Sequence, residues 1–290
     1  MKIAIFGKIF TDESSIYVKK VFDILRKNNV DIIIHEAFEG FLTTKNIISE
    51  YDKLYSSFED LDADMLFCIG GDGTLLESVT HVRNKNIPIL GINTGRLGFL
   101  ATTQKQQIEI DLNNLLKGNY TIDKRSLIWL DSDKDIFGGI NFGMNEFTIL
   151  KRDTSSMIVV HTFIDDVFLN SYWADGLIVS TPTGSTGYSI SCGGPVMLPS
   201  AKNFLICPVS GHNLNVRPLI VPDDCTISFE IEGRSKNFLV SLDSRSRTVD
   251  ATAKLSVKKA PFEAQLIKIE GYNFLDTLRN KLHWGLDQRN

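Results

Sequence analysis

The stretch "CIGGDGTLLES" (residues 68–78) decides how the first part of this sequence folds. It ends the apolar run "DMLFCIG" (64–70) and leads at once into the helical pattern "TLLESVTHV" (74–82). Glycines this close together permit backbone conformations closed to other residues and let a ligand approach the main chain. In α/β sheets, ligands bind where the carboxyl end of a strand meets the amino end of a helix. The stretch therefore predicts a strand–loop–helix unit with a ligand at its loop.

The segments around this stretch continue the same alternation. Strands are predicted at 2–6, 31–38 and 87–93, and helices at 14–28, 45–58 and 106–119. Because the strand runs are apolar throughout and alternate with helices, they predict a parallel sheet that is covered on both faces.

After the helix at 106–119 the pattern changes to strand-like runs, several of which alternate with period two. "FIDDVFLN" (163–170) predicts a hairpin that turns at Asp165 and Asp166. Residues 272–284 are helical again. The predicted fold class is an α/β amino-terminal domain at 1–101 plus a β-rich carboxy-terminal domain at 102–271. A last helix, within 272–290, is expected to pack back on the first domain.

Composition and charge exclude several classes of protein. The chain has 290 residues, 43% of them hydrophobic and 23% charged, as in an ordinary globular protein of about two domains. The net charge is −4 without a basic patch, which argues against binding to nucleic acid or to a membrane surface. The four cysteines form no CxxC pair, and no apolar run reaches about 18 residues. We therefore expect reduced thiols and a cytoplasmic protein.

Asp72 is the most informative residue of the "GGDGT" loop. Free N–H groups and the helix dipole favour a phosphate there, and a carboxylate repels phosphate unless it binds a metal or takes a proton. Alternatively, Asp72 caps the helix, as aspartate often does. The loop is neither a P-loop, since no GxxxxGK[ST] is present, nor a Rossmann fingerprint, since Leu76 occupies the third glycine position.

Two further loops are candidates for phosphate or nucleotide contacts. "NTGRLGFL" (93–100) follows the next strand, and its Arg96 either reaches a phosphate or is a solvated turn residue. "DGLIVSTPTGSTGYSISCGGP" (175–195) offers hydroxyl and amide donors with little bulk, and Tyr188 adds a flat face for a base. A threonine-rich β-turn is the alternative for this second loop.

Other polar residues are weaker candidates on their own. Asn145 and Glu146 pair an amide with a carboxylate at the start of a strand, which suits a ribose diol, and Asp175 directly precedes the threonine-rich loop. Taken alone, such residues are more often surface turn residues. Among the histidines, only His212 is a candidate.

The order of these motifs resembles that of the bacterial NAD kinase family. "GGDGT", "NTGRLGFL", "NE", the 175–195 stretch, "HNLNVRPL" and "LDSR" (242–245) occur in the family's order, over residues 64–250. "GGDGT" alone also occurs in phosphofructokinases and in diacylglycerol-type lipid kinases. The long threonine-rich segment separates the NAD kinases from both.

The resemblance implies an amino-terminal α/β domain like that of phosphofructokinases, a β-rich carboxy-terminal domain, and a homo-oligomer, either a dimer or a tetramer. It implies transfer of the ATP γ-phosphate to the 2′-hydroxyl of the adenosine ribose of NAD, giving NADP, with a divalent metal (Mg or Mn). It also implies roles for particular residues: Asp72 as proton acceptor, Asp72 and Gly73 in the nucleotide site, Asn145 and Glu146 at the adenosine end, Asp175 near the nicotinamide, and Thr186, Gly187, Tyr188, Ser189 and Ser191 around the adenine and its ribose.

Two other functions share parts of this pattern. A lipid or sugar kinase would share "GGDGT" but leave the 175–195 loop unexplained. A noncatalytic dinucleotide sensor would bind NAD without forming NADP, and an intact Asp72 counts against it.

Overall fold

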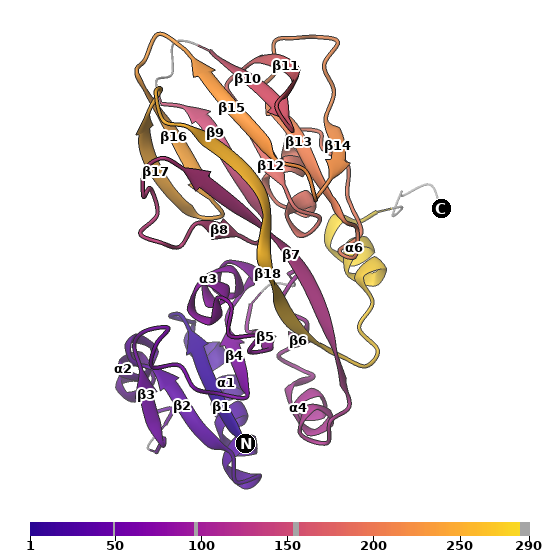
Figure 1. The fold of residues 1–290 in the computed structure, drawn as a ribbon. Coiled ribbons are helices and arrows are strands. Elements are labelled where there is room, and N and C mark those ends of the chain that lie inside the picture. Colours follow the sequence, from indigo (N-terminus) through magenta and orange to yellow (C-terminus); the bar gives the residue numbers. More distant parts are fainter. Residues whose placement is uncertain (49, 96–97, 153–156, 285–290) are drawn as a thin grey trace. The chain divides into compact units, whose positions relative to one another are not determined.

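The computed structural model describes residues 1–48, 50–95, 98–152 and 157–284. The chain forms two compact units: unit 1 comprises Met1–Lys124 and Ala264–Asn290, and unit 2 comprises Arg125–Glu263. Two long strands, β7 (Tyr120–Ser132) and β18 (Leu255–Ile269), carry the chain from one unit to the other (Figure 1). The two units meet at 124/125, within β7, and at 263/264, within β18. The boundaries expected from the sequence were 101/102 and 271/272.

Unit 1 contains a parallel sheet. Its order is β18-β5-β4-β1-β2-β3, with β6 also paired to β5. The strands are β1 (Lys2–Gly7), β2 (Asp31–His35), β3 (Lys53–Tyr55), β4 (Met65–Ile69), β5 (Ile89–Asn93) and β6 (Thr103–Gln104). Every pairing in this set is parallel. The α/β prediction is confirmed.

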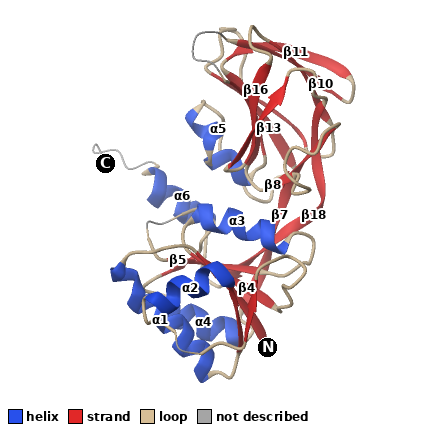
Figure 2. Ribbon diagram, turned by 90° about the vertical axis from the view of Figure 1, so that its left-hand side faces the viewer, coloured by secondary structure: helices blue, strands red, loops and turns tan. Residues whose placement is uncertain are grey.

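Unit 1 also contains helices, the last of which follows β18. They are α1 (Asp12–Lys27), α2 (Glu36–Thr44), α3 (Asp72–Val82), α4 (Ile108–Leu116) and α6 (Phe274–Leu282). Figure 2 shows α1, α2 and α4 grouped beside the strands. Helix α1 buries Val18, Val21, Phe22 and Leu25, the i, i+3, i+4, i+7 stripe of an amphipathic helix, in the core of this unit. No helix in the described part of the chain is both long and apolar enough to span a membrane.

One predicted element of unit 1 was too long and another was wrong. The strand predicted at 31–38 ends at His35, and α2 follows at once because Phe38 and Leu42, one turn apart, are both buried on a helical face. The helix predicted at 45–58 does not form, and its second half holds β3. The Asp52 carboxylate accepts the Ile32 N–H at 2.7 Å, which aligns this segment with β2 as a parallel strand.

Unit 2 is β-rich, as predicted. One antiparallel sheet has the order β14-β13-β12-β9-β16-β17. Its strands are β9 (Glu146–Lys151), β12 (Gly176–Ser180), β13 (Asn203–Val209), β14 (Leu219–Pro222), β16 (Asn237–Leu242) and β17 (Arg245–Asp250). After β12 the chain forms a short 3₁₀ helix η1 (Thr183–Thr186) and α5 (Tyr188–Ser191).

The remaining strands of unit 2 pair in the order β11-β10-β15-β18, and β7 pairs with β18 and β8. They are β8 (Phe142–Gly143), β10 (Ile158–Ile164), β11 (Val167–Ala174) and β15 (Ile227–Glu232). Phe147, Phe204 and Phe238 of the first sheet share a buried core with Val160, Ile227 and Phe229 of these strands. The predicted hairpin is confirmed: Asp165 and Asp166 have φ of 47° and 64°, as primed hairpin turns require.

Candidate functional site

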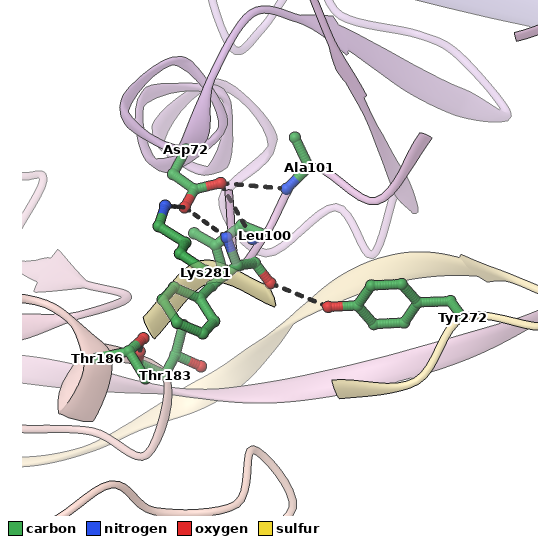
Figure 3. A network of polar contacts seen from close by, with 8 residues as sticks. Asp72, Leu100, Ala101, Thr183, Thr186, Tyr272 and Lys281 are labelled. Carbon is green, nitrogen blue, oxygen red and sulfur yellow. Dashed lines mark hydrogen bonds and ion pairs between the residues drawn. The ribbon is translucent and has the colours of Figure 1, made fainter. Parts of the chain in front are cut away.

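The Asp72 carboxylate is fixed by the loop that follows β5. Its Oδ2 accepts the Phe99 N–H at 2.7 Å, and its Oδ1 accepts the N–H groups of Leu100 at 3.0 Å and Ala101 at 3.2 Å (Figure 3). Asp72 is the first residue of α3, and Gly71 occupies the N-cap position without a side-chain cap. The capping alternative is therefore wrong, because the carboxylate bonds to a different segment of the chain.

Glycine is required at position 98 by this arrangement. A Cβ at Gly98 would lie 2.0 Å from Asp72 Oδ1, so no other residue allows the carboxylate to approach the loop so closely. Gly73 differs, since a Cβ there would meet no atom of the described residues within 4 Å. Packing among the described residues does not demand glycine at 73, which leaves space for a ligand beside the first turn of α3. Arg96, the other candidate of this loop, lies outside the described residues.

A lysine that the sequence analysis missed lies beside Asp72. Lys281 of α6 places its Nζ 3.9 Å from Asp72 Oδ2, with side-chain exposures of 35% and 27% for the two residues. The same Nζ lies 5.0 Å from the centre of the Phe99 ring. The helical pattern of residues 272–284 predicted a helix, but no local sequence signal connects it with residue 72.

In unit 2, a second carboxylate fixes Asn145 and Glu146. Asp243 accepts three successive backbone N–H groups, those of Met144 at 2.8 Å, Asn145 at 2.7 Å and Glu146 at 3.2 Å. It sits in the tight turn between β16 and β17 with φ of 52°, a conformation that aspartate tolerates better than most residues. The sequence analysis quoted "LDSR" but gave Asp243 no role. An acidic residue ending an apolar strand is the only local sign of it.

Glu146 is a buried acid with an unusual pKa. The residue is 8% exposed, and burial, followed by the charge of Asp243, raises its pKa to about 8. A hydrogen bond from the Tyr188 backbone acts in the opposite direction. Glu146 Oε2 and Asn145 Oδ1 are buried, and neither has a hydrogen-bond partner among the described residues. At neutral pH the Glu146 side chain is largely protonated, so it can donate a hydrogen bond as well as accept one.

The threonine-rich loop packs directly on Asn145 and Glu146. A Cβ at Gly184 would lie 2.1 Å from Asn145 O, and one at Gly187 would lie 3.0 Å from Glu146 Oε2. The Thr181 N–H donates to Asn145 O at 2.8 Å. The glycines of this loop thus permit its close contact with the Asn-Glu pair, and the structure brings Asn145, Glu146 and Gly187 together.

The other predicted residues of the loop differ in accessibility. Thr186 is half-buried and its hydroxyl donates to Thr183 O at 3.4 Å. Tyr188 is 40% exposed, and Ser191 is exposed. Ser189 is fully buried, and its hydroxyl faces the Gly184 and Ser185 carbonyl oxygens at 3.3 Å each. Ser189 therefore supports the turn from inside, while its neighbours face outward.

Asp175 lies at the opposite end of β12 from this group. The register pairs Ser180 with Glu146 and Gly176 with Leu150, so the five residues of β12 separate the two ends by about 17 Å. Asp175 Oδ1 forms an ion pair with Lys151 Nζ at 2.6 Å. The pKa of Tyr188 is raised by burial, with smaller contributions from Cys192 and Asp175. An extended ligand along β12 could reach from Glu146 to Asp175.

The described residues form no metal cage, and His212 contacts β11 through its backbone. Within the described ranges, no three His, Cys, Asp or Glu side chains are grouped to hold a metal ion. The His212 backbone N–H donates to Trp173 O at 2.7 Å, and its side chain is exposed.

Comparisons with known proteins identify the family. The family model of the ATP-NAD kinase N-terminal domain matches residues 3–120, and that of the ATP-NAD kinase C-terminal domain matches residues 144–269. NAD kinases of Cytophaga hutchinsonii and Flavobacterium psychrophilum are 54% and 50% identical to this chain, and each match covers 100% of both sequences.

Solved structures of similar fold agree. An NAD kinase from Archaeoglobus fulgidus in complex with ATP has a TM-score of 0.76 at 25% identity, covering 98% of both chains. A yeast NADH kinase complexed with NADH has a TM-score of 0.88 at 20% identity, covering 99% of this chain and 88% of the other, and shows the shared fold. Family models that match both halves of the sequence, together with relatives of full length, show that this chain belongs to the ATP-NAD kinase family.

Proposed function

We propose that this chain is an NAD kinase, which transfers the γ-phosphate of ATP to the 2′-hydroxyl of the adenosine ribose of NAD and so forms NADP. Full-length relatives named NAD kinase, at 54% and 50% identity, support this activity. The structural observation that carries it is the Asp72 carboxylate, which three backbone N–H groups hold at the open amino end of α3.

Asp72 is the proton acceptor of the proposed reaction. A ribose hydroxyl is too weak an acid for a carboxylate to deprotonate in advance, so Asp72 orients the hydroxyl and takes its proton as the new O–P bond forms. The bond between the γ-phosphorus and the bridging oxygen breaks, and ADP leaves with that electron pair. Among the described residues, Oδ1 accepts two N–H groups and Oδ2 accepts one, so Oδ2 is the oxygen proposed to take the proton of the hydroxyl with its remaining lone pair.

The dinucleotide is proposed to lie along β12 of unit 2. Asn145 and Glu146 would bind the adenosine end, because Asn145 Oδ1 and Glu146 Oε2 are buried without a hydrogen-bond partner among the described residues and can exchange hydrogen bonds with a ribose diol. Thr186, Gly187, Tyr188 and Ser191 would surround the adenine and its ribose, and Asp175 would lie near the nicotinamide. Gly73 would leave room for the nucleotide at the first turn of α3.

The metal, the oligomer and the location are further parts of the proposal. Mg²⁺ or Mn²⁺ would be held chiefly by the phosphates of ATP, which is how Mg²⁺ usually binds in kinases.

The exposed side chains of Val167 and Phe168 on β11, the edge strand of its sheet, support a homo-oligomer, either a dimer or a tetramer. Four free cysteines support a cytoplasmic location.

One assay separates this function from the alternatives. Purified protein with ATP, Mg²⁺ and NAD should form NADP, read by an NADP-specific dehydrogenase. NAD binding without NADP would favour the sensor, and phosphorylation of a diacylglycerol without NADP would favour the lipid kinase. The lipid-kinase alternative also leaves the match of residues 144–269 unexplained.

A further inference from the structure

We infer that Lys281, on the last helix of the chain, binds the terminal phosphate of ATP and holds it beside Asp72 during transfer. The inference rests on the proposed function, and it adds a residue that the motifs of the sequence did not point to. Its basis is the geometry of α6 against the loop that fixes the Asp72 carboxylate.

The ammonium of Lys281 makes no hydrogen bond to another described residue. Its Nζ lies 3.9 Å from Asp72 Oδ2, which is too long for a hydrogen bond. The same Nζ lies 5.0 Å from the centre of the Phe99 ring, over its face. A lysine ammonium has three donors. Within the described part of the chain, this half-buried cation is therefore attracted to Asp72 while its three donors remain available for an anion.

Helix α6 is anchored so that Lys281 stays near Asp72. Tyr272 donates a hydrogen bond to Phe99 O at 3.3 Å (Figure 3). The centre of the Phe274 ring lies 6.1 Å from that of the Phe99 ring. The Asn273 side chain caps the helix by accepting the Leu275 N–H at 3.0 Å. The residue whose N–H binds Asp72 Oδ2 thus also holds the start of α6.

A cation in this position removes the electrostatic difficulty posed by Asp72. A carboxylate close to the phosphates repels them, yet it must lie within hydrogen-bond distance of the hydroxyl that attacks the γ-phosphorus. In phosphoryl transfer the charge is spread over the equatorial oxygens of the moving group, and nearby cations stabilise it. Lys281 lies where it can donate to one of those oxygens while it offsets the charge of Asp72.

The first test measures binding in the absence of NAD. Calorimetry compares the affinity for a nonhydrolysable ATP analogue and for AMP, both with Mg²⁺, in the wild type and in Lys281→Met. We expect the analogue to bind about 10- to 100-fold more weakly to the variant, the range for losing a hydrogen bond to a charged group. Binding of AMP, which lacks the terminal phosphate, should not change.

The second test measures turnover with matched variants. Lys281→Met should lower kcat/KM for ATP by at least the factor seen in binding, Lys281→Arg should restore most of it, and NAD binding should be unchanged. Arg279→Gln is the control, because Arg279 is exposed on the same helix and pairs with Asp276 instead. Thermal melting checks the fold, and Lys281→Gln replaces the methionine variant if that variant unfolds early.

Three results would each overturn the inference. They are an unchanged affinity of Lys281→Met for the analogue, an equal loss of affinity for the analogue and for AMP, and no recovery of kcat/KM in Lys281→Arg. A wild type that forms no NADP would defeat the proposed function instead, and the analogue measurement would still decide the role of Lys281.

Discussion

Replacing Glu146 by glutamine should change how the stability of the protein depends on pH. Burial, then the charge of Asp243, raises the pKa of Glu146 to about 8 in the folded chain, from an ordinary value of 4.5. Between these two values the folded state holds a proton that the unfolded state has lost. The free energy of unfolding therefore falls as pH rises through this window, and the full loss is reached above pH 8.

The size of the effect follows from the two pKa values. Between pH 5 and pH 9 this group alone should remove roughly 3 to 5 kcal/mol of stability from the wild type and none from Glu146→Gln. A change of 1 kcal/mol shifts Tm by about 2 to 4 °C. The Tm of Glu146→Gln minus that of the wild type should therefore increase by roughly 6 to 20 °C between pH 5 and pH 9.

Thermal unfolding in a series of buffers from pH 5 to pH 9 measures this difference in Tm. Glu230→Gln is the control, since Glu230 is exposed on β15 and the plots of Tm against pH for this variant and the wild type should be parallel. A difference in Tm between Glu146→Gln and the wild type that does not increase with pH would refute the reasoning. It would mean that Glu146 is ionised in the folded protein and that its burial is compensated by partners.

Two glycine substitutions test the close contacts of the site. Gly98→Ala places a Cβ 2.0 Å from Asp72 Oδ1, so the carboxylate must move. The rate of NADP formation should fall about 100-fold, because a displacement of a catalytic group by 1 Å costs about that factor. Activity close to that of the wild type would show that the contact is dispensable. Gly184→Ala places a Cβ 2.1 Å from Asn145 O, and overpacking should lower the free energy of unfolding by at least about 1 kcal/mol. Denaturant unfolding checks this, and an unchanged stability would show that the loop can move away from Asn145 at no cost.

Local pattern was enough to predict most of the fold. The apolar runs of β1, β4 and β5 and the helical stripe of α1 appear in the structure close to where periodicity placed them. The errors at 31–38 and 45–58 have different causes. Strand β2 ends at His35 and α2 begins at Glu36, so no turn residue marks the boundary between them. Strand β3 is fixed by the contact of Asp52 with Ile32, which lies 20 residues away in the sequence.

Parts of the site could be predicted only where motifs mark them. Asp72 and the Asn145–Glu146 pair stand in recognisable stretches, but the groups that hold them do not. The backbone N–H groups that hold Asp72, those of Phe99 to Ala101, lie 27 to 29 residues away from it in the sequence. The carboxylate of Asp243 lies 97 to 99 residues away from the residues whose N–H groups it binds. Lys281 is further still from Asp72, and only tertiary packing brings such groups together.

The turnover of Asp72→Asn, measured with NAD binding confirmed on the same preparation, tests the central claim most directly. The amide oxygen can still accept the N–H groups of Leu100 and Ala101, so the loop keeps two of its three anchoring bonds while the proton acceptor is lost. We predict that kcat falls about 10²- to 10⁴-fold, the range for acid–base catalysis, while NAD still binds. A kcat close to that of the wild type would contradict the account.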